Sequence, residues 1–241
     1  MRTLVTAILS TTLLVSAPTL AAAASLTVSP VSLDVAAPGA TATIKLRNEG
    51  TAPLNAQIRV FKWIQENGEE KLEPTNEVVA SPPLATLNPG TDYTVRVVRT
   101  SKEATAGGAT YRLLVDELPD PTRAKNGTIT IVLRYSIPVF FYPVDVTRPK
   151  VTWSFNQRNG RWYVSATNNG GRHVRLSSLK LQGTGAAISY GDGLVGYVLG
   201  NSTKSWPIAD SRKLGAGKSV VITADSDAGP ISASTTMQAA R

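Results

Sequence analysis

Histidine, cysteine and paired carboxylates are the residues that most often carry chemistry, and this sequence offers few of them. His173 is the only histidine and the chain contains no cysteine, which excludes thiol catalysis and thiolate metal sites. A metal centre needs several ligands at suitable spacing, so a single histidine in the polar stretch GGRHVR favours a surface position. A Ser-His-Asp triad would need a GxSxG turn to place its serine, and none is present. We expect no metal and no cofactor.

The neighbouring carboxylates Asp116 and Glu117 in VDELP form the second candidate. Adjacent residues of a strand face opposite sides of the sheet, so this pair cannot serve as acid and base on one substrate. A salt bridge that ties the strand end to its neighbours explains them better. The glycines of GDG and GTG precede no helix that could bind phosphate. In RVFKW (59–63), Arg59, Phe61 and Trp63 fall on one face of a strand and Val60 and Lys62 on the other, and one of these faces is expected to lie in a core. This favours an ordinary strand over a surface on which nucleic-acid bases stack. We therefore expect no enzyme and no small-molecule substrate.

The N-terminus predicts export. Arg2 precedes an apolar run from Leu4 to Val15, and the small residues Ala21 to Ala24 suit cleavage, so residues 1–24 are typical of a signal peptide. A retained membrane anchor would need about 20 uninterrupted apolar residues, and the polar residues and Pro18 within this segment argue against one. The net charge is +8, with the basic excess mostly in the second half. An exported protein is not expected to bind nucleic acid, so a solvated basic surface explains this charge.

Short β-branched and apolar runs with turn residues between them dominate the rest of the chain. Runs such as TATIKLRNEG and TDYTVRVVRT, with 19 Gly and 15 Pro to interrupt helices, predict an all-β protein made of sandwiches. The segment PVDVTRPK (143–150) reads as a joint because two prolines enclose a short polar piece. We expect domains at residues 25–146 and 147–241.

The stretch NGTITIVLRYSIPVFFYP (126–143) is unusually long for a strand. Its odd positions from Ile129 to Phe141 are all apolar, which indicates a half-buried strand, whereas strands usually run for about 5 to 6 residues. Pro138 cannot donate to a ladder in the middle of a sheet, so it favours an edge or a switch between sheets. An apolar edge is a template for pairing with another chain. This stretch is therefore a candidate for binding a partner by strand addition.

Several pieces of the first half together resemble one family. They are IRVFKW (58–63), SPPLATLNPG (81–90), TVRVVR around Arg96, YRLLVDELP (111–119) and LRYSIPVFFY (133–142), and GYVLGNSTKSW (196–206) adds a weaker match in the second half. In order and spacing they resemble the periplasmic pilus-assembly chaperones of chaperone-usher systems, the PapD-like family, and most closely its archaic Csu-type branch.

The resemblance implies two immunoglobulin-like β-sandwich domains set at an angle with a cleft between them. It also implies a function in the periplasm, where such a chaperone lends a strand to a pilin subunit until an outer-membrane usher exchanges that strand. By matched position the donated side chains are those of Ile129, Ile131 and Leu133, while Val139 and Phe141 return to the chaperone's own core.

The better-known relatives bind the pilin's C-terminal carboxylate with an arginine on the first strand and a lysine on the donor strand. The matching places here are Val31 and Ser32 on one side and Pro138 on the other, and none of these is a cation. We expect Arg112 to bind the carboxylate instead, because a bidentate arginine suits that ligand. Arg134 and Arg96 are lesser candidates, and pairing of Arg112 with Asp116 is the structural alternative.

Two other readings stay open at this stage. A pilus subunit or tip adhesin of the same system is the alternative function, although such a subunit should have a free donor extension after its signal. An exported enzyme or sugar-binding module would need a pocket with converging polar groups. The expected partners are therefore pilin subunits and the usher, and self-association through the donor-strand edge would also cover the apolar residues.

Overall fold

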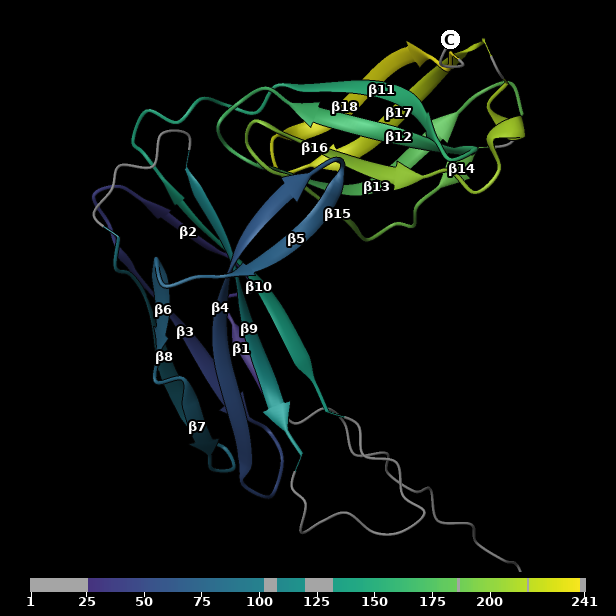
Figure 1. The fold of residues 1–241 in the computed structure, drawn as a ribbon. Helices are drawn as coiled ribbons and strands as arrows, with labels where there is room; N and C mark the ends of the chain where they lie inside the picture. Colours follow the sequence, from purple (N-terminus) through teal and green to yellow (C-terminus); the bar gives the residue numbers. More distant parts are fainter. Residues whose placement is uncertain (1–25, 102–107, 120–131, 186, 216, 239–241) are drawn as a thin grey trace, which may run out of the picture.

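The computed structural model describes residues 26–101, 108–119, 132–185, 187–215 and 217–238. These residues form two β-sandwiches set at an angle, with the first sandwich at the bottom of Figure 1 and the second at the top. A short 3-10 helix, η2 (Ser211–Lys213), interrupts the strands. The all-β, two-domain architecture predicted from the sequence is confirmed.

The first sandwich consists of a four-stranded and a six-stranded sheet. The four-stranded sheet has the order β1-β3-β8-β6, with β1 (Leu26–Ser29), β3 (Thr41–Asn48), β8 (Asp92–Arg99) and β6 (Val78–Ser81). The six-stranded sheet has the order β2-β10-β9-β4-β5, with β7 paired to β4: β2 (Leu33–Ala36), β10 (Arg134–Tyr142), β9 (Ala109–Leu118), β4 (Leu54–Glu66), β5 (Glu69–Pro74) and β7 (Leu84–Leu87).

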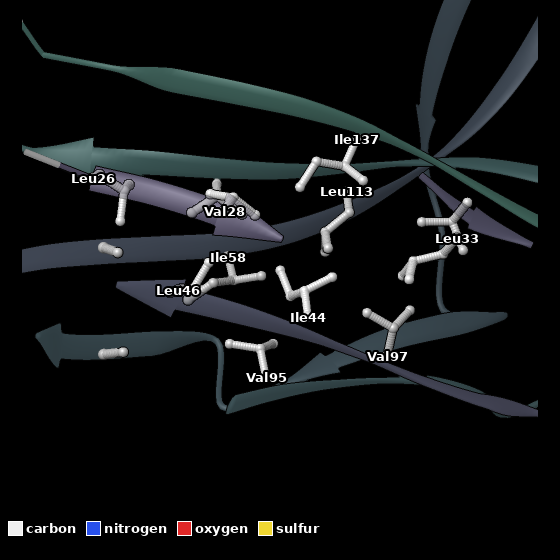
Figure 2. Packing of buried hydrophobic residues seen from close by; sticks show 14 of the residues in the cluster. Leu26, Val28, Leu33, Ile44, Leu46, Ile58, Val95, Val97, Leu113 and Ile137 are labelled. Carbon is white, nitrogen blue, oxygen red and sulfur yellow. The ribbon is translucent and has the colours of Figure 1, made fainter. Parts of the chain in front are cut away.

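Alternate residues of these strands meet between the two sheets. Ile44 and Val97 from one sheet pack with Ile58, Leu113 and Ile137 from the other (Figure 2). Burying a side chain of this size stabilises the fold by about 1.5 to 3 kcal/mol. The apolar face of each strand is therefore held against the opposite sheet. Val139 and Phe141 belong to the same core, as expected from the alternation of the sequence.

The strand β10 is covered on one side along its length and on the other side only in part. It pairs antiparallel with β9 from Arg134 to Phe141, whereas the parallel pairing with β2 begins at Val139. In the described part of the chain, the stretch from Arg134 to Pro138 therefore has no second neighbour. The expectation that Pro138 lies at a sheet edge is confirmed.

The second sandwich has a three-stranded and a five-stranded sheet. The first has the order β11-β12-β16, with β11 (Val151–Arg158), β12 (Arg161–Asn168) and β16 (Ser202–Pro207). The second has the order β14-β13-β17-β18, with β15 paired to β13: β14 (Ile188–Ser189), β13 (Val174–Gln182), β17 (Ser219–Ser226), β18 (Gly229–Thr236) and β15 (Leu194–Val198). Residues such as Val164, Leu176 and Ile222 fill its core.

The hairpin of β4 and β5 extends from the first sandwich to the second (Figure 1). At its tip, the Ser205 backbone N–H donates to the Gly68 carbonyl at 3.0 Å, and Gly68 forms a parallel bridge with Lys204. Gly68 has a φ of +80° and a Cβ there would lie 2.2 Å from the Ser205 Oγ, so this contact requires glycine. The hairpin thus covers the free edge of β16.

Within the described ranges, no helix is long and apolar enough to cross a membrane. The same part of the chain contains no group of three or more histidine, cysteine or carboxylate residues placed to bind a metal ion.

Candidate functional site

Arg112 lies on the outer face of the six-stranded sheet, where that face meets the second sandwich. Its guanidinium Cζ is 3.6 Å from the centroid of the Trp63 ring and 5.4 Å from that of Tyr197. The two rings meet edge to face at 5.5 Å. Alternation brings this about: Tyr111, Leu113 and Val115 of β9 enter the core, so the even residues between them face outward.

The charge of Arg112 has no carboxylate partner within 4 Å among the described residues. Burial lowers the pKa of Arg112, while the negative charge of Glu70 and the Tyr197 ring act in the opposite direction. The one hydrogen bond of its guanidinium among these residues is long, from Nη1 to the Ser136 carbonyl at 3.4 Å. A partly desolvated arginine of this kind binds a carboxylate more strongly than a fully hydrated one does.

Asp116, four residues further along β9, pairs with two other arginines. Its Oδ2 accepts from the Arg59 Nη2 at 2.6 Å, and its Oδ1 accepts from the Arg134 Nε. Burial opposes the charge of Asp116, but the hydrogen bonds and charges of Arg134 and Arg59 outweigh it, so its pKa lies below the ordinary value. The expected salt bridge at this strand end is confirmed. Asp116 is thus occupied by arginines other than Arg112.

The two lesser anchor candidates lie in different surroundings. Arg134 is exposed on β10 and is held by Asp116. Arg96 is exposed on β8, which belongs to the four-stranded sheet on the other side of the sandwich. Among these candidates, only Arg112 combines a position near β10 with the absence of a described carboxylate partner.

The donor-strand residues fall partly outside the described ranges. Ile129 and Ile131 lie there, whereas Leu133 immediately precedes β10 and is half-buried against the edge of the first core. Val31 and Ser32 lie in the segment that crosses from β1 in one sheet to β2 in the other, and Val31 is 71% exposed. Pro138 pairs with Arg112 across the β10–β9 ladder.

The expectation that His173 lies on the surface is wrong. His173 is 5% exposed and stacks on Phe140 with ring centroids 3.7 Å apart. The Tyr142 hydroxyl lies 2.5 Å from its Nδ1. Burial lowers its pKa, although Asp34 and Asp227 act in the opposite direction. Its neighbours Phe140 and Tyr142 come from the outer face of β10 in the first sandwich, and the local sequence GGRHVR carries no sign of them.

The contact between the sandwiches contains further residues that sequence reasoning missed. Phe140 and Tyr142 join Trp63, Tyr197 and Leu199 in a separate buried cluster. The side chain of Gln65 pairs with the backbone of the second domain: its Nε2 donates to the Tyr197 carbonyl at 2.8 Å, and its Oε1 accepts from the Leu199 N–H at 3.0 Å. Most of these residues lie in stretches that carry the family resemblance: IRVFKW, LRYSIPVFFY and GYVLGNSTKSW. The resemblance did not indicate that they meet between the domains.

A comparison with protein families gives the class of this chain. The family described as "Pili and flagellar-assembly chaperone, PapD N-terminal domain" matches residues 25–147. The chain belongs to this family, which consists of assembly chaperones and not of enzymes. A curated relative, the chaperone protein PapD of Escherichia coli, is 32% identical over 95 residues, which span 38% of this chain and 39% of the relative.

Solved structures extend the likeness to both domains. The crystal structure of the CsuC–CsuE chaperone–tip adhesion subunit pre-assembly complex, from the archaic chaperone-usher Csu pili of Acinetobacter baumannii, contains a chain with a TM-score of 0.69 and 25% identity. The match covers 90% of this chain and 100% of that one. The Salmonella enterica SafA pilin–SafB chaperone complex matches with a TM-score of 0.61, 15% identity and coverage of 88% and 97%. The resemblance to the archaic Csu-type branch is confirmed.

Proposed function

We propose that this chain is a periplasmic chaperone that binds pilin subunits by donor-strand complementation and delivers them to an outer-membrane usher. Residues 1–24 would direct its export. Ile129, Ile131 and Leu133 would supply the donated side chains, and Arg112 would bind the subunit's C-terminal carboxylate. The observation that carries the proposal is the open edge of β10 from Arg134 to Pro138, which ends beside Arg112.

The register explains why a carboxylate would arrive at this place. β2 occupies the edge of β10 from Val139 onward, so a strand added to the open stretch must end at about Pro138. Pro138 lies opposite Arg112. A strand that runs parallel to β10 would therefore bring its C-terminus beside this guanidinium, whereas an antiparallel strand would bring its N-terminal amine, which a cation repels.

The sequence parity of the proposed donor residues supports the same arrangement. Ile129, Ile131 and Leu133 have the sequence parity of Ile137, Val139 and Phe141, whose side chains enter the core. A bound subunit that lacks one strand would thus receive a row of apolar side chains. These would extend from the same face of the strand as the side chains that fill the chaperone's own core. Each of them would contribute about 1.5 to 3 kcal/mol on full burial, before the cost of ordering the chains.

Co-expression tests the donor residues. A small β-rich subunit encoded beside the chaperone would be produced in the periplasm with wild-type chaperone or with Leu133→Asp or Ile131→Asp. We expect the two variants to lose the soluble subunit, because a carboxylate cannot enter an apolar groove without a partner. Val132→Asp is the matched control, since Val132 is 44% exposed and has the opposite parity.

The variants must fold for the result to count, so each is purified and its β-sheet circular dichroism and melting temperature are compared with wild type. An unchanged yield of soluble subunit with folded Leu133→Asp and Ile131→Asp would rule out the proposal. Arg112→Met tests the anchor in the same assay, with Arg96→Met as the control on the opposite sheet, and equal yields from these two would reject the role of Arg112.

A further inference from the structure

The second domain supplies one of the two rings that hold Arg112. Tyr197 belongs to β15, and its ring lies 5.4 Å from the Arg112 guanidinium while it also contacts Trp63. Gln65 from the first domain binds the backbone on either side of Val198, at 2.8 and 3.0 Å. The Tyr197 ring therefore lies against Arg112 and Trp63 only while the two domains are in contact.

The second domain also supplies a cation to Glu70, an acidic side chain whose charge acts on Arg112. Glu70 is paired with Gln65 across the β4–β5 ladder, so both lie on the same face of the sheet as Arg112. The Lys204 Nζ of β16 lies 3.6 Å from the Glu70 Oε1. The Lys204 side chain is only 14% exposed, against 33% for Glu70, so solvent screens this pair less than an exposed one.

We infer that the carboxylate site is built by both domains: Tyr197 positions the guanidinium of Arg112, and Lys204 neutralises Glu70, which would otherwise compete for that guanidinium. This inference rests on the proposed function, since it assigns to the second domain a part in recognising the subunit's C-terminus. Tyr197 and Lys204 are positioning residues, and Arg112 remains the group that binds the carboxylate.

Electrostatics decide how large the effect should be. Without Lys204, the charge of Glu70 would both repel an incoming carboxylate and attract Arg112. At an effective dielectric constant near 20, a unit charge within about 10 Å changes carboxylate binding by roughly tenfold. Loss of the Tyr197 ring should weaken binding by about threefold, in line with a modest cation–π contact.

The test uses the full-length chaperone and the subunit that co-purifies with it. A peptide with the subunit's C-terminal strand is made as the free acid and as the carboxamide, and the ratio of the two dissociation constants is measured by calorimetry. Only recognition of the carboxylate moves this ratio, because a general loss of folding or of strand pairing weakens both peptides alike. The variants are Lys204→Met, Glu70→Gln, the double variant, Tyr197→Leu and Tyr197→Phe.

We expect Lys204→Met to reduce the preference for the free acid by roughly tenfold, and Glu70→Gln to restore it in the double variant. Tyr197→Leu should reduce it by about threefold, whereas Tyr197→Phe, which keeps a ring, should not. An unchanged ratio in Lys204→Met and Tyr197→Leu, or no rescue by Glu70→Gln, would overturn the inference. If wild type itself does not prefer the free acid, or no subunit co-purifies, the proposed anchor or function fails instead.

Discussion

Replacement of Gln65 by leucine tests how the two domains are held together. Gln65 is 8% exposed and satisfies two backbone groups of the second domain, the Tyr197 carbonyl and the Leu199 N–H. Leucine has a similar size but can bind neither group. Tyr197 and Leu199 are themselves buried, so water cannot easily replace the lost partners.

The expected magnitude follows from these two contacts. Each buried backbone group left without a partner costs about 1 to 3 kcal/mol, and the added apolar surface of leucine offsets about 1 kcal/mol. The contact between the domains should therefore lose roughly 1 to 5 kcal/mol. Because 1.4 kcal/mol corresponds to a factor of ten, the Leu199 amide should exchange its hydrogen at least about 5 times and up to roughly 4,000 times faster in Gln65→Leu.

Hydrogen exchange read by mass spectrometry or NMR at Leu199 measures this loss directly. Gln57→Leu is the matched control, because Gln57 lies on the same strand and the same face but away from the second domain. That control should change stability by no more than about 0.5 kcal/mol. Equal Leu199 exchange in wild type and Gln65→Leu would refute the assignment of Gln65 as a stabilising link between the domains.

Two further substitutions probe buried polar groups. Asp116→Asn should lower the unfolding free energy by roughly 1 to 2 kcal/mol at pH 7, since its arginine partners are partly exposed. The pKa of Asp116 is depressed in the folded state, so its contribution to stability is present above the unfolded pKa of about 4 and is lost as the pH falls through the folded value. In urea unfolding, the difference in unfolding free energy between wild type and Asp116→Asn should therefore become smaller on acidification. A difference independent of pH would contradict the ion-pair explanation. Tyr142→Phe should lower the unfolding free energy by about 1 to 2 kcal/mol in the same assay, because it removes the hydroxyl that contacts the His173 Nδ1. Tyr190→Phe is the control and should cost less, since the Tyr190 hydroxyl donates to the Pro207 carbonyl at an exposed place. Equal losses would indicate that the buried hydrogen bond contributes no more to stability than the exposed one.

The strand β10 shows how far periodicity alone carries a prediction. The apolar odd positions Ile137, Val139 and Phe141 enter the first core as the alternation predicts. The even residues Phe140 and Tyr142 are also buried, which a strand with one solvated face would not show. The second domain buries them through His173, Tyr197 and Leu199. These residues lie more than 30 positions further along the sequence, so no local pattern could reveal the contact.

His173 was misjudged for the same reason. Apart from Val174, the residues of GGRHVR around it are arginine or glycine, and polar surroundings in sequence usually accompany exposure. Tertiary contact instead places Phe140 against its ring and Tyr142 against its Nδ1. The prediction for Asp116 was more successful, because a carboxylate at a strand end close to basic neighbours on the adjoining strands can find a partner through pairing alone.

By itself the sequence determined the class of fold, the family and the strand whose edge is open. These properties depend on short-range regularities: alternation with period two, turn residues between runs, and motifs in a fixed order. Only the tertiary structure decided the surroundings of Arg112, where Trp63 comes from β4, Tyr197 from β15 and Lys204, beside Glu70, from β16. Those contacts join residues far apart in the chain, and they exist because the β4–β5 hairpin reaches the second domain and packs there.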